Sequence, residues 1–78
     1  MIDKNEITNV AQLGELLRSR RKEMGVTQEQ AADLCDVGPR FIVELEKGKE
    51  TAHLGKILQV MRGYGLQLSV TSRKVGRK

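Results

Sequence analysis

Apolar residues recur at helical spacing through most of this chain, in stretches separated by glycine. The first apolar stripe comprises Val10, Leu13, Leu17 and Met24. Thr8 and Asn9 precede this stripe as candidate N-terminal caps, and Gly25 follows it, so a first helix is predicted from about residue 10 to residue 24. Arg20 and Arg21 flank the stripe, so at least one guanidinium must approach the core and needs a carboxylate partner.

Two shorter helices are predicted on either side of the only proline. Thr27 and Gln30 have the spacing of a capping box, in which each side chain satisfies the backbone N–H of the other, and they open a helix of about two turns. Pro39 suits the first position of a helix, because its missing N–H would have had no partner there and its φ angle is already helical. Gly38 is then the N-terminal cap, and a third helix is expected from Pro39 to a C-terminal cap at Gly48.

The last part of the chain changes from a helical period to a period of two. Thr51 is the candidate cap of a fourth helix, whose apolar positions are Leu54, Ile57, Leu58 and Met61. Beyond residue 65, Leu66, Leu68 and Val70 alternate with polar residues, which predicts a strand over residues 66–71. A lone strand has no ladder partner, so we expect it to pair with the same segment of a second subunit and form a dimer. The alternative is an irregular tail that packs its leucines.

Length and composition favour one small helical domain. A chain of 78 residues lies near the lower size limit for a single hydrophobic core, and one Tyr, one Phe and no Trp make that core aliphatic. The predicted fold is therefore all-α, with four to five helices and one short C-terminal β-strand. No apolar run approaches the roughly 18 residues of a membrane span, and the N-terminus has no apolar signal core. We expect a soluble cytoplasmic protein that does not bind membranes.

The candidate chemistry of the side chains argues against an enzyme. Cys35 is the only cysteine and His53 the only histidine, so neither an internal disulfide nor a Cys/His metal site is expected. The chain contains no glycine-rich phosphate loop and no carboxylate pair at a plausible spacing. We therefore predict no catalytic residue, no cofactor and no metal, and interpret Cys35 as a core thiol.

The net charge of +4 is not spread over the chain. Residues 1–71 contain ten basic and ten acidic side chains, so the excess lies in the C-terminal residues Arg73, Lys74, Arg77 and Lys78. Charge alone therefore says little about the folded part. The predicted organisation is an N-terminal extension (residues 1–9), a helical domain (10–65), a dimerisation strand (66–71) and a flexible basic tail (72–78).

The third predicted helix has one buried face and one outward polar face. On a helical wheel, Ile42, Leu45 and Glu46 share the side that faces the core. The opposite side carries Arg40, Glu44 and Lys47, with Phe41 and Val43 on the two shoulders. Two helices joined by a tight turn, the second with its N-terminal half exposed, have the geometry that places a helix in the DNA major groove.

The stretch VTQEQAADLCDVGPRFIVELEKGK resembles the helix-turn-helix of the phage-repressor class, the Cro/C1 or Xre-type regulators. The matching positions are Thr27, Gln28, Val37, Ile42, Glu46, Gly48 and Lys49. The resemblance covers roughly residues 13–66 and implies a DNA-binding transcriptional regulator. The chain departs from the family pattern in having Asp36 where the turn usually has glycine, Arg20 in place of an aliphatic residue, and no polar side chain at Gly38 or Pro39.

Within that class, the short length and the β-like segment GLQLSV make the chain most similar to HipB-type antitoxins. Such proteins dimerise through C-terminal strands, repress their own operon and bind a HipA-like kinase toxin. The resemblance thus implies a homodimer that binds a palindromic operator in double-stranded DNA. It also makes a HipA-like kinase toxin a candidate partner.

The outward face and the resemblance together predict the DNA-binding residues: Thr27, Gln28, Gly38, Pro39, Arg40, Phe41, Val43, Glu44, Lys47 and Lys49. Gln28 resembles the family glutamine that binds a phosphate and braces the recognition helix. Arg40 can contact guanine O6 and N7, or pair with Glu44 four residues on. Phe41 contacts a thymine methyl group or packs in the core, and both interpretations stay open. Lys47 and Lys49 suit phosphate contacts, although such lysines are often only solvated.

Other residues are given structural roles. Arg21 and Glu46 correspond to an arginine and a glutamate that form an ion pair in phage-type repressors. Leu66, Leu68 and Val70 are the predicted dimerisation residues. The predicted function is a dimeric autorepressor and HipB-like antitoxin of a toxin-antitoxin operon. The alternatives are a protein-interaction module that mainly sequesters a kinase toxin, and a phage-type repressor without a toxin partner.

Overall fold

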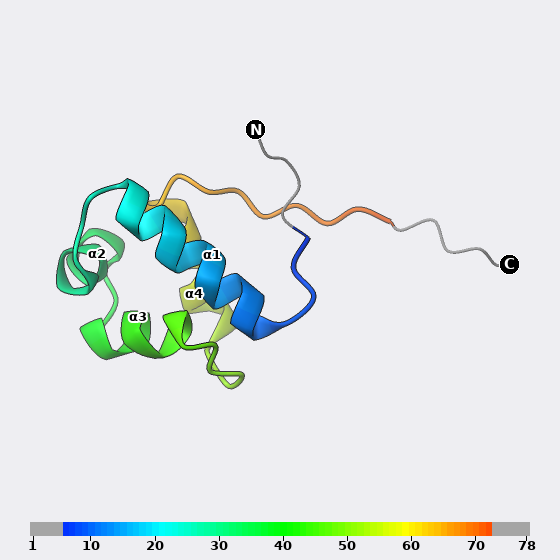
Figure 1. The fold of residues 1–78 in the computed structure, drawn as a ribbon, viewed down its shortest axis with the longest axis horizontal. Helices are drawn as coiled ribbons and strands as arrows, with labels where there is room; N and C mark the ends of the chain where they lie inside the picture. Colours follow the sequence, from blue (N-terminus) through cyan, green and yellow to red (C-terminus); the bar gives the residue numbers. More distant parts are fainter. Residues whose placement is uncertain (1–5, 73–78) are drawn as a thin grey trace, which may run out of the picture.

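Four α-helices form the part of the chain that the structure, a computed structural model, describes, namely residues 6–72 (Figure 1). They are α1 (Val10–Glu23), α2 (Gln28–Cys35), α3 (Pro39–Glu46) and α4 (Leu54–Gly63). The prediction of an all-α domain with four to five helices is confirmed with four, because no fifth helix lies within residues 6–72. The predicted N-terminal extension and basic tail fall partly outside this range.

Three of the helices begin at side chains that accept hydrogen bonds from otherwise unpaired backbone N–H groups. Asn9 Oδ1 accepts from the N–H of Gln12 at 2.8 Å before α1. The predicted capping box of α2 is present, since Thr27 and Gln30 each accept from the other's N–H, at 3.0 and 2.9 Å. The predicted cap of α4 was wrong: His53, not Thr51, precedes this helix, and its Nδ1 accepts from the N–H of residue 56 at 3.3 Å.

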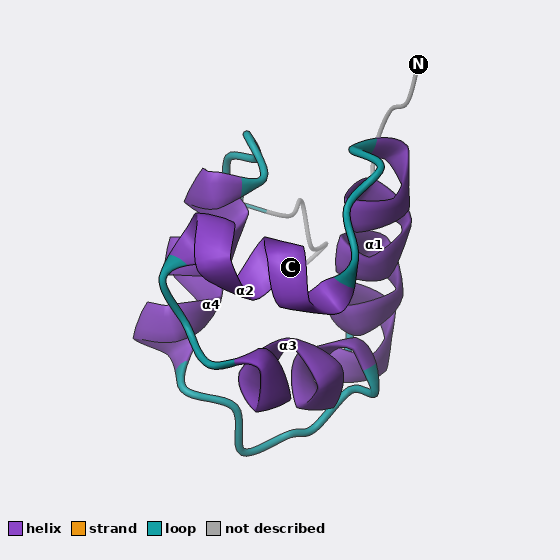
Figure 2. Ribbon diagram, turned by 90° about the vertical axis from the view of Figure 1, so that its left-hand side faces the viewer, coloured by secondary structure: helices purple, strands orange, loops and turns teal. Residues whose placement is uncertain are grey.

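The core lies between the helices and contains one aromatic side chain, that of Tyr64, among aliphatic and sulfur-containing ones. Its fully buried large side chains are Leu17, Ile42, Leu45, Val60 and Tyr64. Helix α2 packs against α3 and α4, and α1 packs against α3 (Figure 2). Small residues allow these close approaches, because a Cβ atom at Gly14 of α1 would lie 2.5 Å from the backbone oxygen of Leu45 in α3.

The C-terminal segment differs from its prediction. Residues 66–72 form neither helix nor strand, so the expected strand over 66–71 is not present in this chain. A strand requires ladder hydrogen bonds to a neighbour, and residues 6–72 of one copy supply no such neighbour. Leu66 packs against the core, whereas Leu68 and Val70 are 55% and 89% exposed, so the alternative of an irregular tail that packs its leucines applies only to Leu66. None of the described helices is long and apolar enough to cross a membrane.

Candidate nucleic-acid interface

The turn between α2 and α3 sets the direction of α3. Asp36 has φ 59°, the left-handed conformation that an Asp side chain tolerates better than most. The N–H of Val37 returns to the carbonyl oxygen of Ala32 at 3.0 Å, which closes the end of α2. Gly38 then precedes α3 without any side-chain cap, and Pro39 occupies its first turn. The pair therefore starts α3, as its sequence predicts, and adds no side-chain hydrogen-bond donor to the surface.

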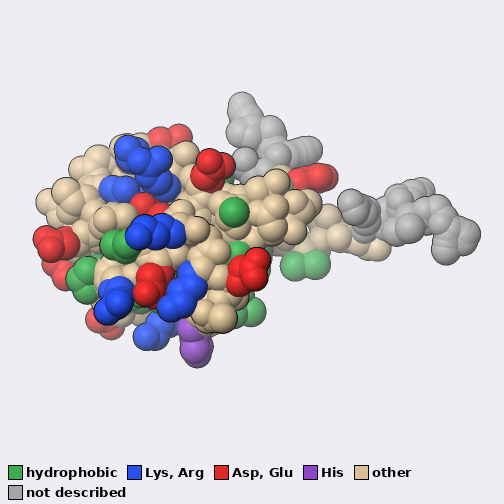
Figure 3. Space-filling model, turned by 60° about the horizontal axis from the view of Figure 1, so that its bottom comes forward, with side chains coloured by type: hydrophobic (Ala, Val, Ile, Leu, Met, Phe, Trp, Pro, Cys, Tyr) green, Lys and Arg blue, Asp and Glu red, His purple; other side chains and the backbone are tan. Residues whose placement is uncertain are grey.

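Helix α3 buries one side and exposes the other. Ile42 and Leu45 are buried, whereas the Arg40 side chain is 89% exposed and Lys47 is also exposed. Val43 is half-buried on the shoulder of this face. Basic and acidic side chains interleave on this side of the molecule (Figure 3). The exposed side of α3 thus begins directly after the turn, which is the arrangement that the sequence predicts for its candidate interface.

Phe41, for which two interpretations stood open, packs against the hydrophobic core as a half-buried side chain. The ammonium group of Lys56, from the first turn of α4, lies 5.9 Å from the centroid of the Phe41 ring, within the range of a cation–π contact. Sequence periodicity within α3 cannot reveal this contact, because Lys56 belongs to another helix. The ring therefore contributes to the packing of α3 against the domain.

Two cations converge on one carboxylate at the exposed side of α3. Arg40 Nε donates to Glu44 Oε2 at 3.3 Å, and Lys49 Nζ donates to Glu44 Oε1 at 3.0 Å. The hydrogen bond and the charge of Lys49, followed by the hydrogen bond and the charge of Arg40, lower the pKa of Glu44 below its ordinary value. Glu44 is thus ionised at neutral pH. The contact with Arg40 was considered from the sequence, whereas that with Lys49 was missed because it crosses the end of the helix.

A buried ion pair joins α1 to α3 behind this surface. Arg21 Nε donates to Glu46 Oε2 at 2.6 Å, and Arg21 Nη2 donates to Glu46 Oε1 at 3.1 Å. The Arg21 and Glu46 side chains are only 10% and 4% exposed. The hydrogen bond to Glu46 raises the pKa of Arg21 above its ordinary value. The two residues that the resemblance to phage-type repressors pairs therefore lie in bidentate contact.

Gln28 connects α2 to the same carboxylate. Its Nε2 donates to Glu46 Oε1 at 3.1 Å, while Arg21 Nη1 donates to the carbonyl oxygen of Val26 at 2.9 Å. Helices α1, α2 and α3 thus each contribute one side chain to a single network of hydrogen bonds. Thr27, the residue before Gln28, is occupied in capping α2 through both its hydroxyl and its N–H. In this structure Gln28 braces α3, which is one half of the role that the resemblance implies.

Arg20, which the sequence singles out as a departure from the family pattern, has a partner that is distant in sequence. Its Nε donates to the carbonyl oxygen of Tyr64 at 2.9 Å, at the end of α4. Its Nη1 also pairs with Glu23 at 3.2 Å on the surface of α1. Arg20 therefore satisfies a C-terminal carbonyl group of α4.

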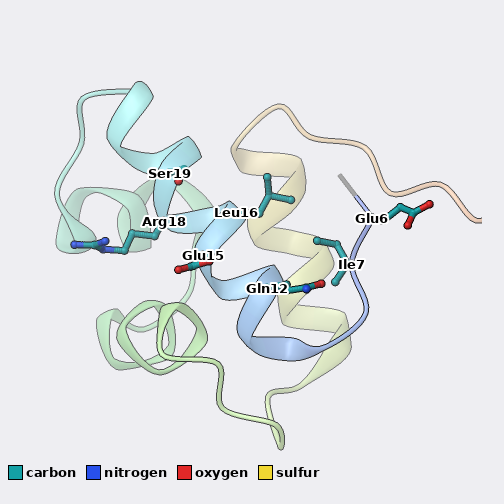
Figure 4. Close-up of a pocket in the computed structure, with 7 residues that line it drawn as sticks. All are labelled: Glu6, Ile7, Gln12, Glu15, Leu16, Arg18 and Ser19. Carbon is teal, nitrogen blue, oxygen red and sulfur yellow. The ribbon is translucent and has the colours of Figure 1, made fainter. Parts of the chain in front are cut away.

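A shallow, open depression of about 550 Å³ lies elsewhere, on the outer side of α1 (Figure 4). It is lined by Glu6, Ile7, Gln12, Glu15, Leu16, Arg18 and Ser19, none of which belongs to the predicted DNA-binding set. Within residues 6–72 no group of three or more His, Cys, Asp or Glu side chains is placed to hold a metal ion. The thiol of Cys35 is buried, and burial raises its pKa.

Comparison with known sequences gives the same domain. Residues 12–73 match the family described as the helix-turn-helix domain. The uncharacterised HTH-type transcriptional regulator y4mF of Sinorhizobium fredii is 42% identical over 72 residues, which cover 92% of this chain and 95% of that protein. An uncharacterised HTH-type transcriptional regulator of Methanothermobacter thermautotrophicus is 38% identical over 50 residues, which cover 64% of this chain and 72% of that protein.

Solved structures extend the likeness in fold. The HipB-O4 20mer complex superposes with a TM-score of 0.82 at 18% identity, covering 91% of this chain and all of that chain (100%). The HipA-HipB-O2-O3 complex matches with the same TM-score of 0.82 and the same 18% identity. At this identity the likeness concerns the fold, and it confirms the resemblance to HipB at that level. From the matching domain and the identical residues that it shares with y4mF, the chain belongs to the helix-turn-helix family of transcriptional regulators.

Proposed function

We propose that this protein is a sequence-specific DNA-binding repressor that reads its operator with the exposed side of α3. The observation that supports this most strongly is the 89% exposure of the Arg40 side chain, one residue after the proline that opens the helix. Gly38 and Pro39 offer no side-chain donors, so Arg40 is the first side chain of α3 able to reach a base. Arginine contacts guanine O6 and N7 through two parallel N–H groups, the commonest specific contact in the major groove.

Phosphate contacts would hold α3 in register on the duplex. The first N–H groups of α2, at Gln28 and Glu29, have no acceptor within the helix and suit a phosphate oxygen. Lys47 is exposed near the end of α3 and suits a phosphate on the other strand. These groups add affinity and salt dependence without reading sequence. Specificity on this proposal comes mainly from Arg40, with Val43 placed to contact a thymine methyl group.

The test is binding of a fluorescent duplex from the protein's own promoter, measured by anisotropy beside an unrelated duplex in about 150 mM salt. Arg40→Ala is expected to lower the preference for the promoter by about 5- to 150-fold, the equivalent of one bidentate base contact. Lys47→Ala is the matched control, because it should weaken both duplexes alike and reduce the salt dependence. If Arg40→Ala keeps the full preference for the promoter, α3 is not the reader.

We infer further that the active form is a homodimer in which residues 66–71 of two chains pair as antiparallel strands. Leu68 and Val70 are exposed on a segment whose backbone has no ladder partner among the described residues of one chain, which supports such pairing. Two linked half-sites would then require a palindromic operator. Deletion of residues 66–78 should give a monomer by light scattering, whereas deletion of residues 73–78 alone should leave the dimer. A dimer that survives the longer deletion would exclude this pairing.

A role as the antitoxin of a toxin-antitoxin operon is the second part of the proposal. It is supported by the likeness in fold to HipB within the HipA-HipB-O2-O3 complex. On this proposal the partner is a HipA-like kinase, and the protein represses the operon that encodes both. Co-expression with the product of the adjacent reading frame should yield a stable complex. A complex that persists with Arg40→Ala and Gln28→Ala would favour toxin sequestration as the main activity, and a lack of any complex would favour a phage-type repressor.

A further inference from the structure

Glu44 is an acidic side chain on the helix face that is proposed to meet DNA, where a carboxylate would be repelled by phosphates. It is only 33% exposed, and each of its two oxygens is occupied by a different cation. Oε2 accepts from Arg40 and Oε1 accepts from Lys49. The carboxylate thus lies between two basic groups and is more than a solvated surface charge.

The atoms that Arg40 uses for this contact leave its reading end free. Only Nε donates to Glu44, at 3.3 Å, while neither Nη1 nor Nη2 has a partner among the described residues. Guanine is read by two parallel N–H groups at the far end of the guanidinium. A carboxylate that holds Nε therefore orients the fork without competing for the donors that would contact the base.

Lys49 is held in place by the structure that ends α3. Gly48 has φ +82°, and the N–H of Lys49 returns to the carbonyl oxygen of Glu44 at 3.1 Å. A Cβ atom at Gly48 would lie 2.9 Å from the Cα atom of Ala11 in α1, so the turn sits tightly against the domain. Lys49 thus approaches Glu44 from a fixed backbone, balances the second oxygen and leaves the three side chains with one net positive charge.

We propose that, within the DNA-reading function proposed above, Glu44 is a positioning residue that aims the Arg40 guanidinium at a guanine and so helps to determine the operator sequence. Free arginine side chains lose rotamer freedom when they bind, and a preset orientation reduces that loss only for the matched base. Phosphates gain nothing from this orientation, and the negative charge of Glu44 weakens their binding. Loss of Glu44 should therefore have opposite effects on specific and non-specific binding.

The experiment compares Glu44→Gln with the parent protein, using Glu50→Gln as a control for the charge. Glu50 is exposed and has no ion pair within residues 6–72, so its replacement removes the same charge without freeing Arg40. The probes are the promoter duplex, an unrelated duplex of equal length, and promoter duplexes in which single guanines are replaced by 7-deazaguanine. Anisotropy gives the dissociation constant of each, and circular dichroism checks that both variants fold.

Glu44→Gln is expected to bind the unrelated duplex about 2- to 5-fold more tightly, because one repulsive charge is lost. Its preference for the promoter should fall by about 3- to 10-fold, a part of the discrimination that one bidentate arginine contact supplies. The 7-deazaguanine that weakens the parent most, by removing the N7 acceptor, should weaken this variant less. Glu50→Gln should change both duplexes equally.

An unchanged or increased preference in Glu44→Gln overturns the inference, since Glu44 would then only repel DNA. The proposed function can fail separately. If the parent does not distinguish its promoter from unrelated DNA, both proposals fall. If the parent discriminates and Arg40→Ala abolishes the preference while Glu44→Gln retains it, the reading role of Arg40 stands and the positioning role of Glu44 is excluded.

Discussion

Replacing Arg21 by methionine removes the cation from the buried contact that joins α1, α2 and α3. Methionine keeps the length and much of the apolar stem of the side chain, so the main change is the loss of the guanidinium. The Glu46 carboxylate, 4% exposed, is left with Gln28 as its remaining donor. Glu46→Leu makes the reciprocal change and leaves the Arg21 charge with only the carbonyl oxygen of Val26.

The expected cost follows from this burial. Removing one partner of a buried ion pair destabilises proteins by about 3–5 kcal/mol, because the other charge stays buried without its partner. A domain of this length is stable by roughly 4–12 kcal/mol, so each single change should remove a large fraction of the free energy of unfolding. The double variant Arg21→Met with Glu46→Leu leaves no buried charge and should lie within about 2 kcal/mol of the parent. The coupling between the two sites is then at least about 4 kcal/mol.

Urea unfolding followed by far-ultraviolet circular dichroism is the suitable assay, because the helices report on the whole domain and the chain has no tryptophan. The four proteins of the cycle are measured at the same pH and salt, and their free energies of unfolding are compared. The reasoning fails if the double variant loses as much as the two single variants together. It fails equally if each single variant loses less than about 1 kcal/mol of the free energy of unfolding. So small a loss is typical of a solvent-exposed ion pair, not of a buried one.

Three further predictions concern the core and the helix contacts. Burial, followed by the charges of Cys35 and Glu46, raises the pKa of Tyr64 from its ordinary value to about 12. Because the unfolded chain loses the phenol proton first, the free energy of unfolding should be constant below pH 10 and fall by up to about 3 kcal/mol between pH 10 and 12. The near-ultraviolet absorbance of this single tyrosine checks it, and a midpoint near 10 in the folded protein would contradict it. Gly14→Ala should destabilise by about 1–3 kcal/mol despite the better helix propensity of alanine, because its Cβ would meet the α3 backbone at 2.5 Å; urea midpoints no lower than the parent's would refute the close contact. Gly63→Ala should also destabilise, since its Cβ would lie 2.5 Å from Cys35 Sγ, and adding Cys35→Ala should recover part of the loss; strictly additive effects would argue against that clash.

Local signals in the sequence predict the helix boundaries that depend on neighbouring residues. The capping box of Thr27 and Gln30 involves groups three residues apart, and Pro39 at the start of α3 follows from its own ring. The fourth helix shows the limit of such signals. Thr51 has the side chain preferred for capping, yet the cap lies two residues later at His53, whose ring lies close to Gly55, and the helix begins at Leu54. Residue preference alone does not distinguish two candidate caps so close together.

In the candidate site, too, the sequence predicts features within one helix but not contacts between elements. Helical periodicity separates the buried Ile42 from the exposed Arg40, because both positions depend only on the pitch of one helix. Contacts between elements carry no such signal. Lys49 reaches Glu44 only because Gly48 reverses the chain, and Arg20 meets Tyr64 from 44 positions away. The strand expected at residues 66–71 likewise depends on a partner that alternation within one chain does not supply.

The network of Arg21, Gln28 and Glu46 also bears on how this domain can change during evolution. Both oxygens of Glu46 accept hydrogen bonds from side chains of other helices. A single substitution of Arg21 or Glu46 therefore leaves a buried polar group without its partner, which is destabilising. Such single substitutions should seldom be neutral. Arg40 and Lys47 are exposed on the opposite side of α3, so replacing either of them leaves no buried polar group without a partner. Mutation can therefore retarget the reading surface one residue at a time while the angle between the helices stays the same. A library randomised at the exposed positions should thus be rich in folded proteins.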